Sequence, residues 1–159
     1  MTETKYFIIE AEVDKTNLIT WNQEIEQERK SAVFDLLNNG KFKLDNKNET
    51  GPYKINIKLL EWKLILRVID FFDDSNTDIK ISISNVRRII RDYQIVCDNY
   101  VEAIKTAPLK KIEAIDIGRR TIHDEGAVMI IEAFKEKVEL DMDTARRLFT
   151  LVSIISIKI

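Results

Sequence analysis

The first half of the chain follows the two-residue period of β-strands. The segment 5–13 has this character, and 52–72 is predicted to form a hairpin with a turn near Glu61. Each hairpin strand has one mainly apolar face, made by Tyr53, Ile55, Ile57 and Leu59 and then by Leu64, Leu66, Val68 and Asp70. A further short strand is expected at 79–83.

A helix and a polar loop separate these strands. Residues 21–37 carry apolar side chains at helical spacing, with Thr20 as a suitable N-cap. Gly40 follows where a glycine commonly ends a helix. Residues 38–51 are polar and rich in turn-forming residues, and are therefore predicted to form a loop. The segment 73–78 is predicted to be a second loop.

From Ser84 onward the period becomes helical. One continuous apolar stripe is formed by Val86, Ile89, Ile90, Tyr93, Val96, Cys97, Tyr100, Val101 and Ile104. Pro108 suits the first turn of a second helix, which runs from about 109 into 134–137. Asp141 or Asp143 is expected to cap a final helix. That helix is apolar around most of its circumference, so it is predicted to pack between other elements.

Two glycines, Gly118 and Gly126, interrupt the second helical pattern. Each costs about 1 kcal/mol relative to alanine in a helix. Either they let another helix approach closely, or Gly126 ends one helix and a short one follows.

These segments predict an α+β protein folded as a single domain, 1–159. The expected architecture is a small antiparallel sheet plus one N-terminal helix, packed on a C-terminal cluster of about three helices. A chain of 159 residues can bury roughly two thirds of the surface that its unfolded form exposes, which is enough for an unassisted core.

The composition argues against several classes of binding partner and location. The formal net charge of −2 gives no electrostatic basis for binding nucleic acid. The longest apolar stretch, 148–157, is about half of the ~20 residues that a membrane span requires. The N-terminus lacks the pattern of a signal peptide, and a single cysteine, Cys97, fits a reducing compartment. We therefore expect a cytoplasmic protein that does not interact with membranes.

Motifs for cofactors and metals are absent from the sequence. No glycine-rich phosphate loop occurs, and one histidine with one cysteine is too few for a typical zinc site. A nucleophilic triad could use only His123 as its base, and no serine lies in a suitable context. The sequence predicts neither a cofactor nor a metal.

The stretch 115–126, IDIGRRTIHDEG, contains the only histidine, His123. On a helical wheel Asp116, Arg119 and His123 fall at the edge of the apolar side, whereas Arg120 points further towards solvent. As a functional cluster, Asp116 would orient His123 while Arg119 holds an oxyanion. As a structural network, Asp116 would pair with an arginine and His123 would cap the network. The sequence leaves both alternatives open.

Six arginines occur as adjacent pairs, which are Arg87–Arg88, Arg119–Arg120 and Arg146–Arg147. The first and last pairs lie at the starts of helices, where the helix dipole disfavours cations. Such arginines either serve an anion that is attracted to the helix N-terminus or are neutralised locally. Local partners are available in Asp92 for the first pair and Asp143 for the last.

Several strings resemble the uncharacterised protein family UPF0262, whose members are small alphaproteobacterial proteins. The resemblance covers nearly the whole chain and is carried by ERKSAVFDLL (28–37), GPY (51–53), RRIIRDY (87–93), EAI (102–104), IEAIDIGRR (112–120), IHDEG (122–126) and DTARRLFTLV (143–152). It implies a bacterial cytoplasmic protein. It implies no activity, cofactor or catalytic residue.

The first functional hypothesis is a non-enzymatic binding or regulatory module that engages an anionic ligand or an acidic partner surface through the paired arginines. The alternative is a metal-independent enzyme acting on a small anionic substrate, with His123 as general acid/base oriented by Asp116 or Glu113. A third possibility is an oligomer in which a second copy covers the apolar last helix. An enzyme requires that His123 face a concave pocket.

Overall fold

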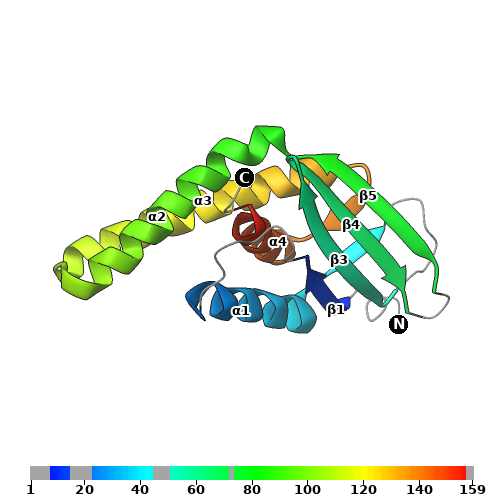
Figure 1. Cartoon of the computed structure of the whole chain (residues 1–159), viewed down its shortest axis with the longest axis horizontal. Coiled ribbons are helices and arrows are strands. Elements are labelled where there is room, and N and C mark those ends of the chain that lie inside the picture. Colours follow the sequence, from blue (N-terminus) through cyan, green and yellow to red (C-terminus); the bar gives the residue numbers. More distant parts are fainter. Residues whose placement is uncertain (1–7, 15–22, 45–50, 72–73, 157–159) are drawn as a thin grey trace.

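The computed structural model describes residues 8–14, 23–44, 51–71 and 74–156. In chain order the elements are β1 (Ile8–Val13), α1 (Gln23–Asn39), β2 (Phe42–Leu44), β3 (Tyr53–Leu60), β4 (Lys63–Asp70), β5 (Asn76–Ser82), η2 (Ser84–Val86), α2 (Arg87–Thr106), α3 (Leu109–Phe134), β6 (Val138–Leu140) and α4 (Met142–Ile155). Figure 1 shows the β3–β4–β5 strands at one end of the molecule and the α2–α3 hairpin extending towards the other. The α+β class is confirmed.

The central hairpin agrees with the predicted alternation. β3 and β4 pair antiparallel, with Ile57 opposite Leu66 and a turn at Glu61 and Trp62. Each of the eight residues predicted to share the apolar faces is buried. Among them is Asp70, whose Oδ2 accepts a hydrogen bond from the Gly51 N–H at 2.7 Å.

One strand pair differs from the predicted antiparallel sheet. β1 runs parallel to β3, with Ile8 opposite Tyr53 and Val13 opposite Ile57. The chain passes through α1 between these strands, and a helical crossover returns the next strand in the same direction. The larger sheet is therefore mixed, in the order β1-β3-β4-β5.

The predicted loop 38–51 contains structure of its own. α1 continues to Asn39, and β2 follows almost at once, pairing antiparallel with β6. Phe42 and Leu44 of β2 are buried. Three residues are too few to produce a visible period, so these strands could not be recognised from the sequence. Thr20 and residues 45–50 lie outside the described part of the chain.

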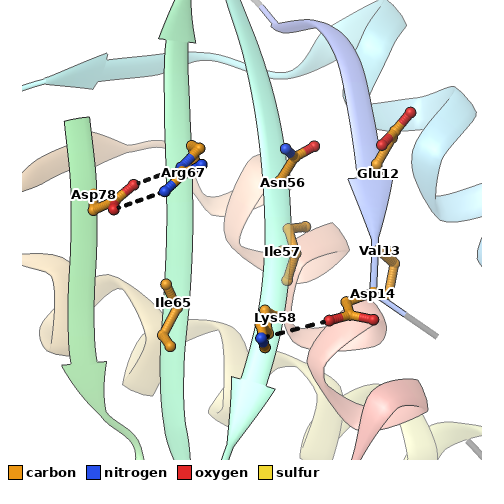
Figure 2. Close-up of a pocket in the computed structure, with 9 residues that line it drawn as sticks. All are labelled: Glu12, Val13, Asp14, Asn56, Ile57, Lys58, Ile65, Arg67 and Asp78. Carbon is orange, nitrogen blue, oxygen red and sulfur yellow. Dashed lines mark hydrogen bonds and ion pairs between the residues drawn. The ribbon is translucent and has the colours of Figure 1, made fainter. Parts of the chain in front are cut away.

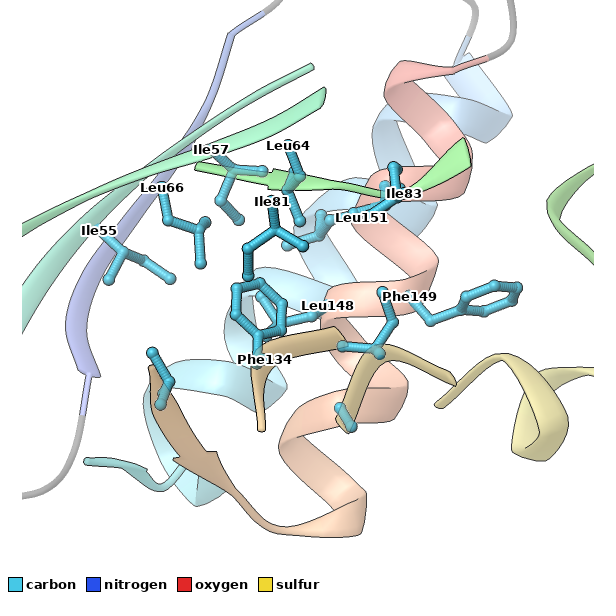
Figure 3. Packing of buried hydrophobic residues seen from close by; sticks show 14 of the residues in the cluster. Ile55, Ile57, Leu64, Leu66, Ile81, Ile83, Phe134, Leu148, Phe149 and Leu151 are labelled. Carbon is cyan, nitrogen blue, oxygen red and sulfur yellow. The ribbon is translucent and has the colours of Figure 1, made fainter. Parts of the chain in front are cut away.

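The last helix, α4, occupies the centre of the fold, as predicted. It packs against α1, α2, α3 and β3 within one chain. Leu148 and Leu151 lie on the side towards the sheet, while Phe149 projects away from it (Figure 3). Asp141 caps the helix, because its Oδ1 accepts a hydrogen bond from the Thr144 N–H at 2.9 Å. The apolar surface of α4 is thus covered without a second copy of the chain.

The α2–α3 hairpin resolves the question raised by the two glycines. α3 continues through Gly126, and a Cβ added there would lie 2.3 Å from Cε1 of Phe149. Gly126 therefore lets α4 approach α3, whereas a Cβ at Gly118 would meet nothing within 4 Å. The far end of the hairpin extends past α4, so Ile104 is 52% exposed although it belongs to the predicted apolar stripe.

None of the helices in the described residues is both long enough and apolar enough to span a membrane.

Candidate functional site

An open groove of about 580 Å³ lies where all four helices meet. It is lined by Gln27, Glu28, Ser31 and Ala32 of α1, Tyr93 of α2, Arg119 and His123 of α3, and Arg147 and Thr150 of α4. Three of these residues, Arg119, His123 and Arg147, belong to the set of site residues predicted from the sequence. His123 therefore faces a concave surface.

His123 is held by contacts from two other helices. Its Nε2 lies 2.8 Å from the Thr150 hydroxyl, which itself donates a hydrogen bond to the Arg146 carbonyl at 3.1 Å. Because the hydroxyl hydrogen is used in that bond, the Thr150 oxygen accepts from Nε2–H, which assigns the neutral Nε2-protonated tautomer. The imidazole stacks on Tyr93 at a centroid distance of 5.2 Å and meets the edge of Phe149 at 5.8 Å.

These surroundings keep His123 uncharged. Burial, followed in importance by the positive charge of Arg147, lowers the pKa of His123 to about 4. At neutral pH the imidazole then has no second proton to donate, and it is a weak base. The hydrogen bond to Thr150 and the low pKa favour a structural role for His123 in the groove over a role as general acid/base.

The shifted pKa predicts a pH-dependent stability. In the unfolded chain the histidine has a pKa of about 6.5, so it binds a proton that the folded chain does not bind until the pH approaches 4. Stability is therefore fully present above pH 6.5 and falls as the pH is lowered, by about 2 kcal/mol between pH 7 and pH 5. Urea unfolding at the two pH values should show this loss in the wild type, and a smaller one in His123→Gln.

The single histidine makes the pKa directly measurable. The imidazole signal in an NMR titration needs no assignment, because only one histidine exists. We expect a midpoint near pH 4. A midpoint above 6 would contradict the described environment.

Asp116 does not orient His123, contrary to the functional version of the predicted cluster. Its Oδ1 accepts hydrogen bonds from Arg119 at 2.6 and 3.1 Å, and its Oδ2 pairs with Arg120 at 2.7 Å. The hydrogen bond from Arg119 is the main cause of the lowered pKa of Asp116. His123 does not cap this network either, because its partner is Thr150. Asp116 instead fixes Arg119, whose guanidinium also lies 5.1 Å from the centre of the Tyr100 ring.

Two of the arginine pairs are divided between the groove and the outer surface. Arg147 lines the groove and its Nε lies 3.3 Å from Asp35, while its neighbour Arg146 pairs on the surface with Asp124 at 2.8 Å and Asp143 at 2.7 Å. Arg119 and Arg120 divide in the same way: Arg119 lines the groove, whereas the side chain of Arg120 is 73% exposed.

The third pair, Arg87–Arg88, lies away from the groove. Both residues are exposed, and the Arg87 guanidinium is 5.3 Å from the centre of the Trp62 ring at the β3–β4 turn. The N-termini of α2 and α4 therefore do not meet at His123. Of the six arginines predicted to bind an anion, the groove brings together Arg119 and Arg147.

Sequence reasoning missed every polar residue of the groove except Arg119, His123 and Arg147. Tyr93 was counted in an apolar stripe, Thr150 lay within an apolar helix, and Glu28 was one of several acids on α1. A hydroxyl in the middle of an apolar run is the one signal that could have been noticed, since a buried hydroxyl requires a partner. Nothing in the sequence distinguishes Glu28 from its neighbours.

A second depression, of about 500 Å³, lies on the outer face of the sheet (Figure 2). Paired residues of neighbouring strands cross it, and Arg67 binds Asp78 at 3.0 and 3.3 Å. Lys58 lies 4.0 Å from Asp14. Exposed pairs of this kind satisfy one another and contribute little stability. This surface brings together none of the predicted site residues.

The described residues contain no group of three or more histidine, cysteine, aspartate or glutamate side chains that could hold a metal ion. The groove offers the guanidinium donors of Arg119 and Arg147, whereas the Nε2–H of His123 and the hydroxyl hydrogen of Thr150 are already engaged. The same surface carries one carboxylate, that of Glu28.

The fold and the groove define an α+β protein with a helix-lined pocket. Its sequence matches the model of the Uncharacterised protein family (UPF0262) over residues 5–158, and the chain belongs to this family. A UPF0262 protein of Ruegeria sp. (strain TM1040) is 40% identical over 152 residues, which cover 93% of this chain and 96% of the relative.

Similarity extends to other alphaproteobacteria. A UPF0262 protein of Cereibacter sphaeroides (strain KD131) is 38% identical over 152 residues, or 93% of this chain and 96% of the relative. One from Brucella canis is 40% identical over 132 residues, or 83% and 82%. No solved structure matches the fold.

Proposed function

We propose that this chain is a non-enzymatic binding protein whose helix-lined groove takes a small organic anion. The observation that carries the proposal is the convergence of Arg119 and Arg147, from two different helices, on one concave surface that also holds His123 and Thr150. Guanidinium groups form paired, charge-assisted hydrogen bonds with carboxylates and phosphates.

The electrostatic field in the groove supports an anionic ligand. The charges of Arg147 and Arg119 both act to lower the pKa of His123, against the opposite effect of Asp124, so both guanidinium groups act on the space beside the imidazole. Because its imidazole is neutral, His123 contributes no charge of its own to ligand binding. Ala32 and Tyr93, which are both buried, form an apolar floor to the groove.

Binding is favoured over catalysis because of the state of His123. A residue that remains neutral down to about pH 4 supplies no proton at physiological pH.

We also propose a cytoplasmic location. Its support is the single thiol, Cys97, in which burial raises the pKa to about 11 and so keeps the group unreactive.

Neighbouring arginines provide a matched test. A panel of small carboxylates and phosphates is screened by thermal shift, and the affinities of binders are measured by calorimetry. Arg147→Gln should weaken binding at least about tenfold, since a hydrogen bond to a charged group contributes about 1.5–3 kcal/mol. Arg146→Gln, one position away but on the outer surface, should change the affinity less than about twofold.

Arg119→Gln and Arg120→Gln form a second matched pair with the same expectation. Binding should also weaken as salt is raised. The proposal is wrong if no anion of the panel binds, or if the inner and outer arginine variants lose affinity equally while remaining folded by circular dichroism.

A further inference from the structure

We infer that the ligand of the groove is an α-amino acid, whose carboxylate faces Arg119 and Arg147 while its ammonium group faces Glu28. This inference rests on the proposed function and adds a second recognition element to it. The groove contains a negative side chain that a plain anion would have to avoid, and an ammonium group would use that side chain.

Glu28 shares the groove with both arginines. It lies on α1, across from the α3 and α4 residues, and it is the one acidic side chain among the described residues that line the groove. Its charge would repel a second carboxylate brought beside it, and the repulsion is stronger in a partly desolvated groove than in water. A ligand with charges of both signs satisfies all three groups at once.

The described residues around Glu28 compensate the charge of its carboxylate only in part. Although Glu28 as a whole is an exposed residue, the surrounding protein desolvates its carboxylate and raises its pKa, and the charge of Arg119 offsets this only in part. Arg119 is already engaged by Asp116. A bound ammonium group would provide the missing positive charge.

The shared groove favours a ligand that carries both charges close together. Glu28 of α1 and Arg119 of α3 line the same surface, and the positive charge of Arg119 acts to lower the pKa of Glu28. An α-amino acid carries its two charges on neighbouring carbons, so its carboxylate can face Arg119 and Arg147 while its ammonium group faces Glu28. Its side chain then extends along Tyr93 and Ala32.

The test compares amino acids with their deaminated analogues in the full-length protein. Calorimetry is performed with the pairs L-phenylalanine and 3-phenylpropionate, L-leucine and 4-methylpentanoate, and L-alanine and propionate. At least one amino acid should bind about tenfold more tightly than its analogue. In Glu28→Gln the two members of that pair should differ less than about twofold, with the affinity for the analogue unchanged or improved. Glu102→Gln is the control, because Glu102 pairs with Lys105 outside the groove.

The outcomes separate this inference from the proposed function. If the analogues bind as tightly as the amino acids and depend on Arg147, the inference is overturned and the anion site stands. The inference is also overturned if the preference for amino acids persists in Glu28→Gln. If neither these compounds nor any other anion binds, both proposals fail.

Discussion

Phe149→Ala is expected to lower the free energy of unfolding by about 3–5 kcal/mol. The ring of Phe149 is fully buried, and it meets Tyr93 at 5.3 Å and His123 at 5.8 Å between ring centres. Removing it leaves a cavity under the groove that rigid helices cannot fill. Urea unfolding followed by circular dichroism measures the effect.

A second phenylalanine provides the control. Phe34 on α1 is 65% exposed, so Phe34→Ala should change the stability by less than about 0.5 kcal/mol. Equal losses in the two variants would show that Phe149 is not in the core. Loss of Phe149 should also loosen His123 and shift its NMR signal, because the two rings are in contact.

Gly126→Leu is expected to destabilise the fold by about 3 kcal/mol, even though leucine favours helices. The first atom of any side chain at this position would lie 2.3–2.6 Å from three carbons of the Phe149 ring. That ring cannot move easily, since Tyr93 and His123 hold it from other sides. Thermal or urea unfolding should show the loss.

Gly118→Ala, eight residues earlier on the same helix, should increase the stability of the fold. A Cβ at Gly118 meets no atom within 4 Å, so alanine adds only its helix propensity, about 0.5–1 kcal/mol of stability. If Gly126→Leu were as stable as wild type, the close contact of α3 with α4 would be incorrect.

Much of the fold follows from periodicity in the sequence. The hairpin of β3 and β4 could be predicted because a shift of one residue would expose Ile57 and Leu66 to water. The cap at Asp141 and the burial of α4 follow from local chemistry and from a helix with little polar surface. These features depend on neighbours in the sequence.

The remaining features depend on long-range pairing. The parallel alignment of β1 with β3 is set by where α1 crosses, and the pairing of β2 with β6 joins segments almost 100 residues apart. Neither strand pairing produces a local pattern in the sequence from which it could be predicted.

The candidate site was predictable only in part. The helical wheel placed Arg119 and His123 on the inner edge of α3, and both line the groove. It could not show that Thr150 of α4, rather than Asp116 of the same helix, is the partner of His123. Arg146 and Arg147 are indistinguishable in the sequence, and only the packing of α4 decides that Arg147 lines the groove.

The most direct test of the proposed groove follows the His123 imidazole by NMR while the tightest-binding carboxylate of the panel is added. His123 is the only histidine and lines the groove. A carboxylate bound beside it should shift its signals and raise its pKa from about 4, and neither change should occur in Arg147→Gln at the same concentration. Saturation of the protein by that carboxylate with the His123 signals and pKa unmoved would show that the anion binds elsewhere.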